Sequence, residues 1–428
     1  MSPPAAATLP APAGLAYGLL GFPIAFAALP LYVVLPHHYA DHLGLSLASI
    51  GALLMAVRLV DAVVEPWLGR ASDALFARST RTVLWTGAAS ALLQWLGMAA
   101  LFHPAVADPS ALSAWLGAGL LLTCTAHSLL AITHQAWGVR LGGGEVLRSR
   151  IVAWREGLGL LGVITASALS VAWGANAMLA VYAATLLLGW CVWWRAPEPT
   201  PQVQAPSPSA TPASLWLPLA QPAFRRLLAV FLCNGIASAI PAALMLFFAQ
   251  DRLGASEQAT ALFLVLYFVC GAASMPLWLR AVRRWGLAKS WLLGMLLAVV
   301  CFAWTASLST GHITAFACIC ALTGLALGAD LALPGALLAR LIASHGAQGR
   351  HDGSYLGWWS LATKLNLALA AGAALPLLQW LGYAPGSQDP HALQHLAWAY
   401  ALLPCLLKLV AAWLLYALLI RTTPTRNP

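Results

Sequence analysis

The chain has 428 residues, of which 61% are hydrophobic and only 8% are charged. Soluble domains carry about 25% charged residues, so this composition excludes a soluble globular protein and indicates a polytopic membrane protein. The formal net charge of +9 would suggest a nucleic-acid partner in a soluble protein, but here the positions of the basic residues argue for another cause.

Hydrophobic stretches of about 20 residues recur along the chain, and each is long enough to cross a bilayer. Backbone polar groups find no water in the hydrocarbon, so these stretches are expected to be helices. We predict an all-α membrane protein with twelve transmembrane helices, at 15–38, 46–74, 82–102, 111–137, 152–174, 176–195, 225–250, 257–281, 288–308, 312–342, 354–382 and 393–421.

The predicted loops alternate in charge. With the N-terminus inside, the cytoplasmic loops and helix ends hold most of the arginines, whereas the opposite loops hold only Arg252. This bias follows the positive-inside rule and predicts that both termini are cytoplasmic. The positive net charge is then explained by the basic residues that face the cytoplasm, and no nucleic-acid partner is expected. No basic stretch precedes the first span, so no cleaved signal peptide is expected and the chain fits a multi-pass protein of a bacterial inner membrane.

One long polar stretch divides the chain. Residues 196–224 are rich in Pro, Ser and Thr, which favours an extended cytoplasmic linker. This linker separates an N-terminal six-helix bundle, residues 1–195, from a C-terminal six-helix bundle, residues 225–428. The two halves resemble each other weakly, since Pro66 matches Pro276 and a basic loop follows both. Six-helix pseudo-repeats are the plan of a large transporter class that binds its solute at mid-membrane.

Three ionisable residues lie near the middle of the second predicted helix. Arg58, Asp61 and Glu65 are spaced by three and four residues, which places them on one face of the helix. Each costs about 2.5–3.5 kcal/mol inside a bilayer, so such residues are kept when they pair or have a function. Carboxylates four residues apart can offer oxygen ligands to one cation. We predict cation binding at Asp61 and Glu65 with Arg58 as charge partner; the alternative is a structural ion pair.

The segment RLVDAVVEPWLGRASD, residues 58–73, carries a more specific resemblance. It is similar to the second helix of the glycoside–pentoside–hexuronide:cation symporters, the melibiose-permease-like branch of the major facilitator superfamily. That family has an Arg, two acids four apart, a Pro, and then a Gly and an Asp at the cytoplasmic end. Here these are Arg58, Asp61, Glu65, Pro66, Gly69 and Asp73. Weaker matches begin at Tyr17, Arg148 and Ala362, and Asp330 lies at a loosely matching place, so the resemblance covers nearly the whole chain.

The resemblance implies a major facilitator fold and symport of a small, sugar-like solute with H+ or Na+, the coupling ion being bound by Asp61 and Glu65. Glu65 replaces the family's more usual Asp, which favours H+. The family's sugar-binding acids are missing. Ile24 and Ala25 stand where its first helix has a Lys-Asp pair, and Thr133, or His134 in a shifted register, stands where its fourth helix has an Asp. A galactoside is therefore not expected.

We expect polar and aromatic side chains to line the substrate cavity: Tyr17, Thr133, His134, Gln135, Trp137, Arg155, Asn234, Asp330 and Lys364. Lys364 is expected to pair with Asp330 or with an acid of the second helix. Alternatively, these residues are hydrogen-bonded members of the core, and Arg155 extends its charged group to the cytoplasmic surface. For Lys408 we expect such snorkelling, in which the ammonium reaches the membrane surface.

A second motif lies between the second and third predicted helices. Gly69, Asp73, Arg78 and Arg81 form a facilitator-type loop motif, and we predict that they belong to the cytoplasmic gate rather than to a binding site.

The sequence contains no phosphate loop and no catalytic triad spacing, so an enzyme is not expected. We expect no cofactor other than the coupling ion, and no metal other than Na+ at Asp61 and Glu65. The expected partners are a small-molecule solute and membrane lipid, with the protein a monomer. Two alternatives stay open: a carrier of amphipathic lipid-like or drug-like molecules on the same fold, and a non-transporting receptor or assembly factor that shows no ion-dependent binding.

Overall fold

The computed structural model describes residues 9–172, 174–199, 214–384 and 386–421. The predicted linker therefore lies largely outside the described residues. The chain divides into two compact units. The first comprises Met1–Ala220 with Ala339–Leu361, and the second comprises Gln221–Leu338 with Ala362–Pro428. The first unit thus includes the end of one helix and the start of the next from the second half of the sequence.

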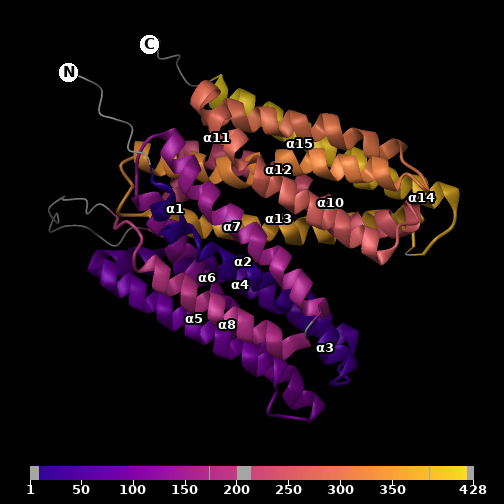
Figure 1. Cartoon of the computed structure of the whole chain (residues 1–428), viewed down its shortest axis with the longest axis horizontal. Helices are drawn as coiled ribbons and strands as arrows, with labels where there is room; N and C mark the ends of the chain where they lie inside the picture. The colour runs from indigo at the N-terminus through magenta and orange to yellow at the C-terminus, as the bar shows by residue number, and fades with distance from the viewer. Residues whose placement is uncertain (1–8, 173, 200–213, 385, 422–428) are drawn as a thin grey trace. The chain divides into compact units, whose positions relative to one another are not determined.

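The first unit is built from helices that pack against one another along their length (Figure 1). Ser46, Ser79 and Asp108 each accept a hydrogen bond from a backbone N–H in the first turn that follows, which explains where three of the helices begin. The helices are α1 (Ala11–Gly18), α2 (Gly21–Phe26), α3 (Leu35–Asp41), α4 (Leu47–Arg78), α5 (Thr80–Phe102), α6 (Pro109–Arg140), α7 (Glu145–Ala172), α8 (Gly174–Trp193) and α9 (Leu217–Ala220), with a π-helical turn at Pro30–Val34.

The second unit contains α10 (Pro222–Phe247), α11 (Glu257–Phe302), α12 (Ile313–Ser344), α13 (Asp352–Trp380), α14 (Pro390–Ala397) and α15 (Leu403–Leu415), except that the end of α12 and the start of α13 belong to the first unit. Short π or 3-10 segments follow α10, α11, α14 and α15, at Phe248–Arg252, Ala303–Ser307, Trp398–Leu402 and Tyr416–Ile420.

The helix α11 joins two of the predicted spans without a loop. Its 46 residues are interrupted at Gly286, whose φ of 76° is non-helical. Glycine adopts this left-handed conformation without the steric penalty that a Cβ brings. The sequence predicted separate helices at 257–281 and 288–308, and the chain turns between them within a single residue.

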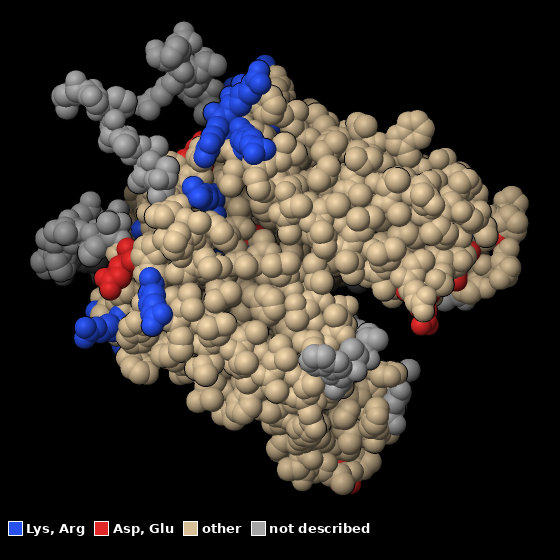
Figure 2. Space-filling view, in the orientation of Figure 1, with Lys and Arg blue, Asp and Glu red and all other residues tan. Residues whose placement is uncertain are grey.

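The helices have the length and composition of membrane spans. Among the described residues, nine helical segments are long and apolar enough to cross a bilayer. Two more, α4 and α13, have 32 and 29 residues, and α11 supplies two spans. Each of the twelve predicted ranges therefore overlaps a helix of the structure. The face of the molecule seen in Figure 2 is almost free of charge, with Lys, Arg, Asp and Glu confined to small patches, as expected of a surface that contacts lipid.

Small residues allow the helices to approach closely. A Cβ added at Gly18 of α1 would lie 2.8 Å from the backbone of Trp154 in α7, and one at Gly162 of α7 would lie 2.1 Å from the carbonyl oxygen of Phe22 in α2. Membrane helices pack through such small residues because lipid provides little hydrophobic driving force between them. These contacts hold α1 and α2 against α7.

Candidate functional site

The helix α4 carries a polar stripe on its inner face. Asp61, Glu65, Gly69 and Asp73 recur every four residues, so they lie one above another. Asp61 is 3% exposed and Glu65 is 0% exposed. The other side of the helix is apolar and faces outward, at Leu59, Val60, Val63 and Trp67. The sequence placed the acids on one face of a membrane helix, and the structure buries that face inside the protein.

Asp61 lies at the contact between α4 and α6. Its Oδ1 accepts a hydrogen bond from the Ser128 hydroxyl at 3.1 Å. In α6, the residue before Ser128 is His127, whose Nδ1 lies 2.8 Å from Nε2 of the fully buried Gln94 in α5. Hydrogen bonds thus join α6 to α4 through Ser128 and Asp61, and α6 to α5 through His127 and Gln94. The guanidinium of Arg58 lies 4.1 Å from the centre of the Tyr32 ring, a cation–π contact.

On the C-terminal side of the two acids, α4 contacts the start of α13 at glycine residues. A Cβ at Gly69 would lie 2.2 Å from the carbonyl oxygen of Gly353, and a Cβ at Gly353 would lie 2.2 Å from that of Gly69. Four residues further along α13, a Cβ at Gly357 would lie 2.5 Å from the carbonyl oxygen of Glu65. Two glycines spaced by four are the small-residue pattern that brings membrane helices into backbone contact. The backbone of Glu65 itself is part of this contact.

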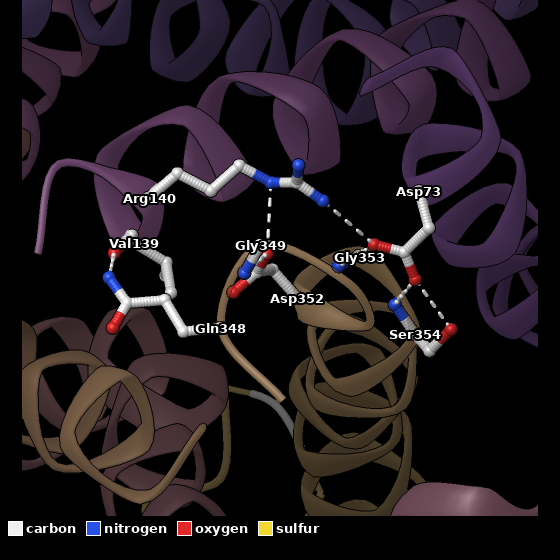
Figure 3. A network of polar contacts seen from close by, with 8 residues as sticks. All are labelled: Asp73, Val139, Arg140, Gln348, Gly349, Asp352, Gly353 and Ser354. Atoms are coloured by element: carbon white, nitrogen blue, oxygen red, sulfur yellow. Dashed lines mark hydrogen bonds and ion pairs between the residues drawn. The ribbon is translucent and has the colours of Figure 1, made fainter. Parts of the chain in front are cut away.

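The last residue of the stripe, Asp73, binds the N-terminus of α13 (Figure 3). Its carboxylate accepts hydrogen bonds from the backbone N–H of Gly353 at 2.7 Å and of Ser354 at 2.9 Å, and from the Ser354 hydroxyl at 2.7 Å. The first N–H groups of a helix have no partner within the helix, and the helix dipole favours negative charge there. Asp73 therefore caps a helix to which it does not belong.

Arg140, at the end of α6, joins the same network (Figure 3). Its Nη2 lies 3.4 Å from Asp73 and its Nε lies 2.9 Å from the fully buried carboxylate of Asp352. Asp352 in turn accepts a hydrogen bond from the backbone N–H of Gly349 at 2.7 Å. Buried charges are tolerated when they are paired and hydrogen-bonded. This network ties the end of α4 and the end of α6 to the start of α13.

Further contacts support the network. Gln348 donates a hydrogen bond to the carbonyl oxygen of Val139 at 3.1 Å, and Arg340 of α12 forms an ion pair with Glu145 of α7. Of the predicted gate residues, Gly69 and Asp73 contact α13, whereas Arg78 and Arg81 are exposed. Their role in a cytoplasmic gate stays a prediction.

The predicted cavity residues of the first unit are mostly buried together. Tyr17 donates from its hydroxyl to the carbonyl oxygen of His134 at 3.2 Å, and Nε2 of His134 lies 2.8 Å from the carbonyl oxygen of Tyr17. The hydroxyl of Thr133 donates to its own helix, and Trp137 donates to the carbonyl oxygen of Pro197 at 2.9 Å. Gln135 and Arg155 are half-buried, and Arg155 forms an ion pair with Glu156. Whether these side chains contact a solute stays a prediction.

The second unit has a polar centre at Asp330. Its carboxylate lies 2.7 Å from Nζ of Lys408, 2.9 Å from the indole nitrogen of Trp291 and 3.2 Å from Nδ2 of Asn234. Lys408 also donates to the Ser238 hydroxyl at 2.9 Å. The expectation that Lys408 snorkels is therefore wrong, because this side chain is 8% exposed and pairs with Asp330. Lys364 is half-buried.

Sequence reasoning missed three polar partners in these networks. Lys408 was missed because a lysine inside a predicted span was expected to extend its ammonium towards the membrane surface. Arg140 was taken as one of many loop arginines, and its contact to α13 has no sequence signal. Asp352 carried a usable signal, since an acidic residue within two positions before a predicted helix is typical of a helix start.

Comparisons with known proteins agree with this architecture. The family model described as MFS/sugar transport protein matches residues 15–421. A bacterial homologue of the iron transporter ferroportin in its outward-facing state superposes with a TM-score of 0.71 at 16% identity, over 95% of this chain and 98% of that one. The E. coli fucose:proton symporter superposes with a TM-score of 0.65 at 15% identity, over 94% and 98%. A comparison with curated protein sequences gives no significant match.

Identities this low show that the fold is shared and nothing finer, whereas the family model covers nearly the whole chain. The predicted all-α, major facilitator fold is therefore confirmed. The protein is a transporter rather than an enzyme, and the chain belongs to the MFS/sugar transport protein family of the major facilitator superfamily.

Proposed function

We propose that this transporter carries a small, sugar-like solute across a bacterial inner membrane in symport with a cation, H+ or Na+, which binds at Asp61 and Glu65. The observation that carries the proposal is the burial of both carboxylates, 3% and 0% exposed, on the inner stripe of one membrane helix. Ionisable residues inside a bilayer mark ion or substrate pathways. The family model, which describes sugar transport proteins, supports the class of solute.

The geometry of α4 offers a route for coupling. The acids and the α13-binding residues lie on the same stripe, and the backbone of Glu65 touches the helix that Asp73 caps. Binding of a cation neutralises charge on the stripe, so it favours the conformation in which this site is more deeply buried. The coupled solute then moves with the change between conformations.

The experiment uses the purified protein in liposomes with an imposed pH or Na+ gradient and a panel of labelled neutral sugars. We expect Asp61→Asn and Glu65→Gln to abolish gradient-driven accumulation while leaving the protein folded, because each removes a charge that the cation neutralises. Glu257→Gln is the matched control, since Glu257 is an exposed carboxylate at the start of α11. Accumulation at the wild-type level in both Asp61→Asn and Glu65→Gln would rule out the assigned cation site.

A second candidate cargo, an amphipathic lipid-like or drug-like molecule, has one observation in its favour. An apolar groove of about 300 Å³ runs between α5 and α8, lined by small alanines and by Trp95 and Trp190. Thermal-shift measurements with sugars and with lysolipids separate the two candidates. Stabilisation by lysolipids alone would favour the amphipathic cargo.

A further inference from the structure

Two buried amides in the second unit are not used in the function proposed above, although Asn234 is among the residues expected to line the cavity. Asn234 on α10 is 3% exposed and Asn366 on α13 is 5% exposed. The Oδ1 atom of each is buried and accepts no hydrogen bond within the described part of the chain. A buried acceptor without a donor is destabilising, so native proteins rarely retain one unless it serves a purpose.

The orientation of the Asn234 amide is set by its neighbour. Its Nδ2 donates to Oδ1 of Asp330 at 3.2 Å. If the amide were reversed, its oxygen would face a carboxylate oxygen, and the two would repel. The Oδ1 of Asn234 is therefore held away from Asp330 as an acceptor. Because Asp330 is paired with Lys408 at 2.7 Å, the surroundings carry no net charge from this pair.

The amide of Asn366 lies directly on the backbone of α10, at the residue that follows Asn234. A Cβ at Gly235 would lie 1.8 Å from Nδ2 and 2.5 Å from Cγ of Asn366. Only glycine leaves room for the amide at this position. The two acceptors are thus contributed at adjacent positions along α10, one from the helix itself and one from α13.

We propose that Asn234 and Asn366 form a hydroxyl-binding subsite for an uncharged, polyhydroxylated solute. The proposal rests on the function proposed above and adds the residues that select the solute. Amide oxygens accept hydrogen bonds, so they need a donor from the solute. The neutral Asp330–Lys408 pair gives no attraction for a cationic donor, and an apolar cargo would leave both acceptors unpaired. Hydroxyl groups satisfy both requirements, and sites built to bind a hydroxyl reject analogues that lack it.

The test measures binding to the full-length protein in nanodiscs. The probes are L-fucose, D-galactose and D-xylose, the single-deoxy analogues of whichever sugar binds, and choline and lysophosphatidylcholine as cationic and amphipathic competitors. We expect Asn234→Ala and Asn366→Ala to weaken sugar binding at least tenfold. One deoxy analogue should bind the wild type at least tenfold more weakly than its parent sugar, yet bind one of the variants as well as the parent does. Without ligand, Asn366→Ala should melt at or above the wild-type temperature, whereas Asn234→Ala also removes a hydrogen bond to Asp330 and is judged by sugar binding and selectivity alone.

Gly235→Ala tests the subsite without removing a polar group. The added methyl displaces the amide of Asn366, which is the end of a flexible side chain, so the helix itself need not move. We expect the same loss of sugar affinity as in Asn366→Ala. Gly372→Ala on α13 is the matched control, because a Cβ there meets nothing within 4 Å, and it should bind sugar as the wild type does.

The outcomes separate this inference from the proposed function. Wild-type sugar affinity in all three subsite variants would overturn the subsite, while cation-driven uptake that still depends on Asp61 would leave the symport proposal standing. Sugar binding that depends on the two amides but not on any cation would support the subsite and overturn the symport proposal. A lower melting temperature of Asn366→Ala with unchanged selectivity among deoxy sugars would show a structural amide only. Binding of choline or lysophosphatidylcholine, or of no probe sugar at all, by the wild type would also overturn the subsite.

Discussion

At the scale of single residues, carboxylates inside the bundle differ in how the protein compensates them. Asp73 receives two backbone N–H groups and a hydroxyl from α13, and Asp330 receives an ammonium, an indole and an amide. Both are therefore bound by several donors. Asp61 likewise accepts a hydrogen bond, from the Ser128 hydroxyl of α6. Of these three acids, we assign Asp61 to the cation, together with its neighbour Glu65.

The pair of Asp330 and Lys408 gives a prediction about stability. Both side chains are about nine-tenths buried, so removing one partner leaves an uncompensated charge away from water. We expect Asp330→Asn or Lys408→Met alone to cost about 3–5 kcal/mol, whereas the double variant, which leaves no charge, should be close to the wild type. Thermal unfolding of the purified protein in detergent measures this. Equal destabilisation in the single and double variants would contradict an ion pair as the source of the effect.

At the scale of elements, α4 explains how one helix serves two purposes. Its outer face is apolar, and its inner face carries Asp61 and Glu65 near the middle and a glycine contact with α13 nearer the C-terminus. The sequence predicted this helix at 46–74, and the structure confirms it at Leu47–Arg78. The partner helix α13 was predicted as well. Their contact was not, because the pattern of two glycines four residues apart in α13 does not name the helix that it packs against.

The glycine contact gives a prediction for α4 and α13. Gly69→Ala places a methyl 2.2 Å from a backbone oxygen, which no side-chain rotation relieves. We expect a loss of about 1–3 kcal/mol in stability from this overpacking, and a larger loss if the helices cannot separate.

The matched control is Gly51→Ala in the same helix, where a Cβ meets nothing within 4 Å. This change should be neutral or stabilising by up to about 1 kcal/mol, since alanine is the better helix former. The melting temperatures of the two variants decide the matter. Equal effects at Gly69 and Gly51 would mean that the close approach of α4 and α13 is unimportant for stability.

At the scale of the whole molecule, the division into units differs in one respect from the division of the sequence. The predicted halves meet at residues 196–224, whereas residues 339–361 lie within the first unit although the second half of the sequence contains them. The reason is the network around Asp73 and Arg140, which binds the start of α13 to α4 and α6. Side chains distant in sequence decide this assignment.

The positive-inside pattern gives a prediction for the whole chain. Both termini should be cytoplasmic, and the turn after α11, which contains Gly311, should be periplasmic. Alkaline phosphatase fused after the last residue should therefore be inactive, and the same enzyme inserted at Gly311 should be active. A folded fluorescent protein at the C-terminus is the complementary control. The reverse pattern of activities would overturn the predicted orientation.

Much of the fold followed from composition alone, because hydrocarbon permits few backbone structures and a run of about 20 apolar residues has few alternatives to a spanning helix. The same physics singled out Asp61 and Glu65 as candidate functional residues, because a charged side chain in a membrane helix is costly and is rarely kept without a function. The tertiary structure decided which groups compensate each charge: Lys408 for Asp330, Arg140 for Asp352, and the N-terminus of α13 for Asp73. Those pairings depend on donor–acceptor distances of about 3 Å between side chains or backbone groups on helices that are far apart in the sequence. Helical periodicity in a sequence predicts the face of the helix on which a residue lies, but it does not predict which residue of another helix lies opposite.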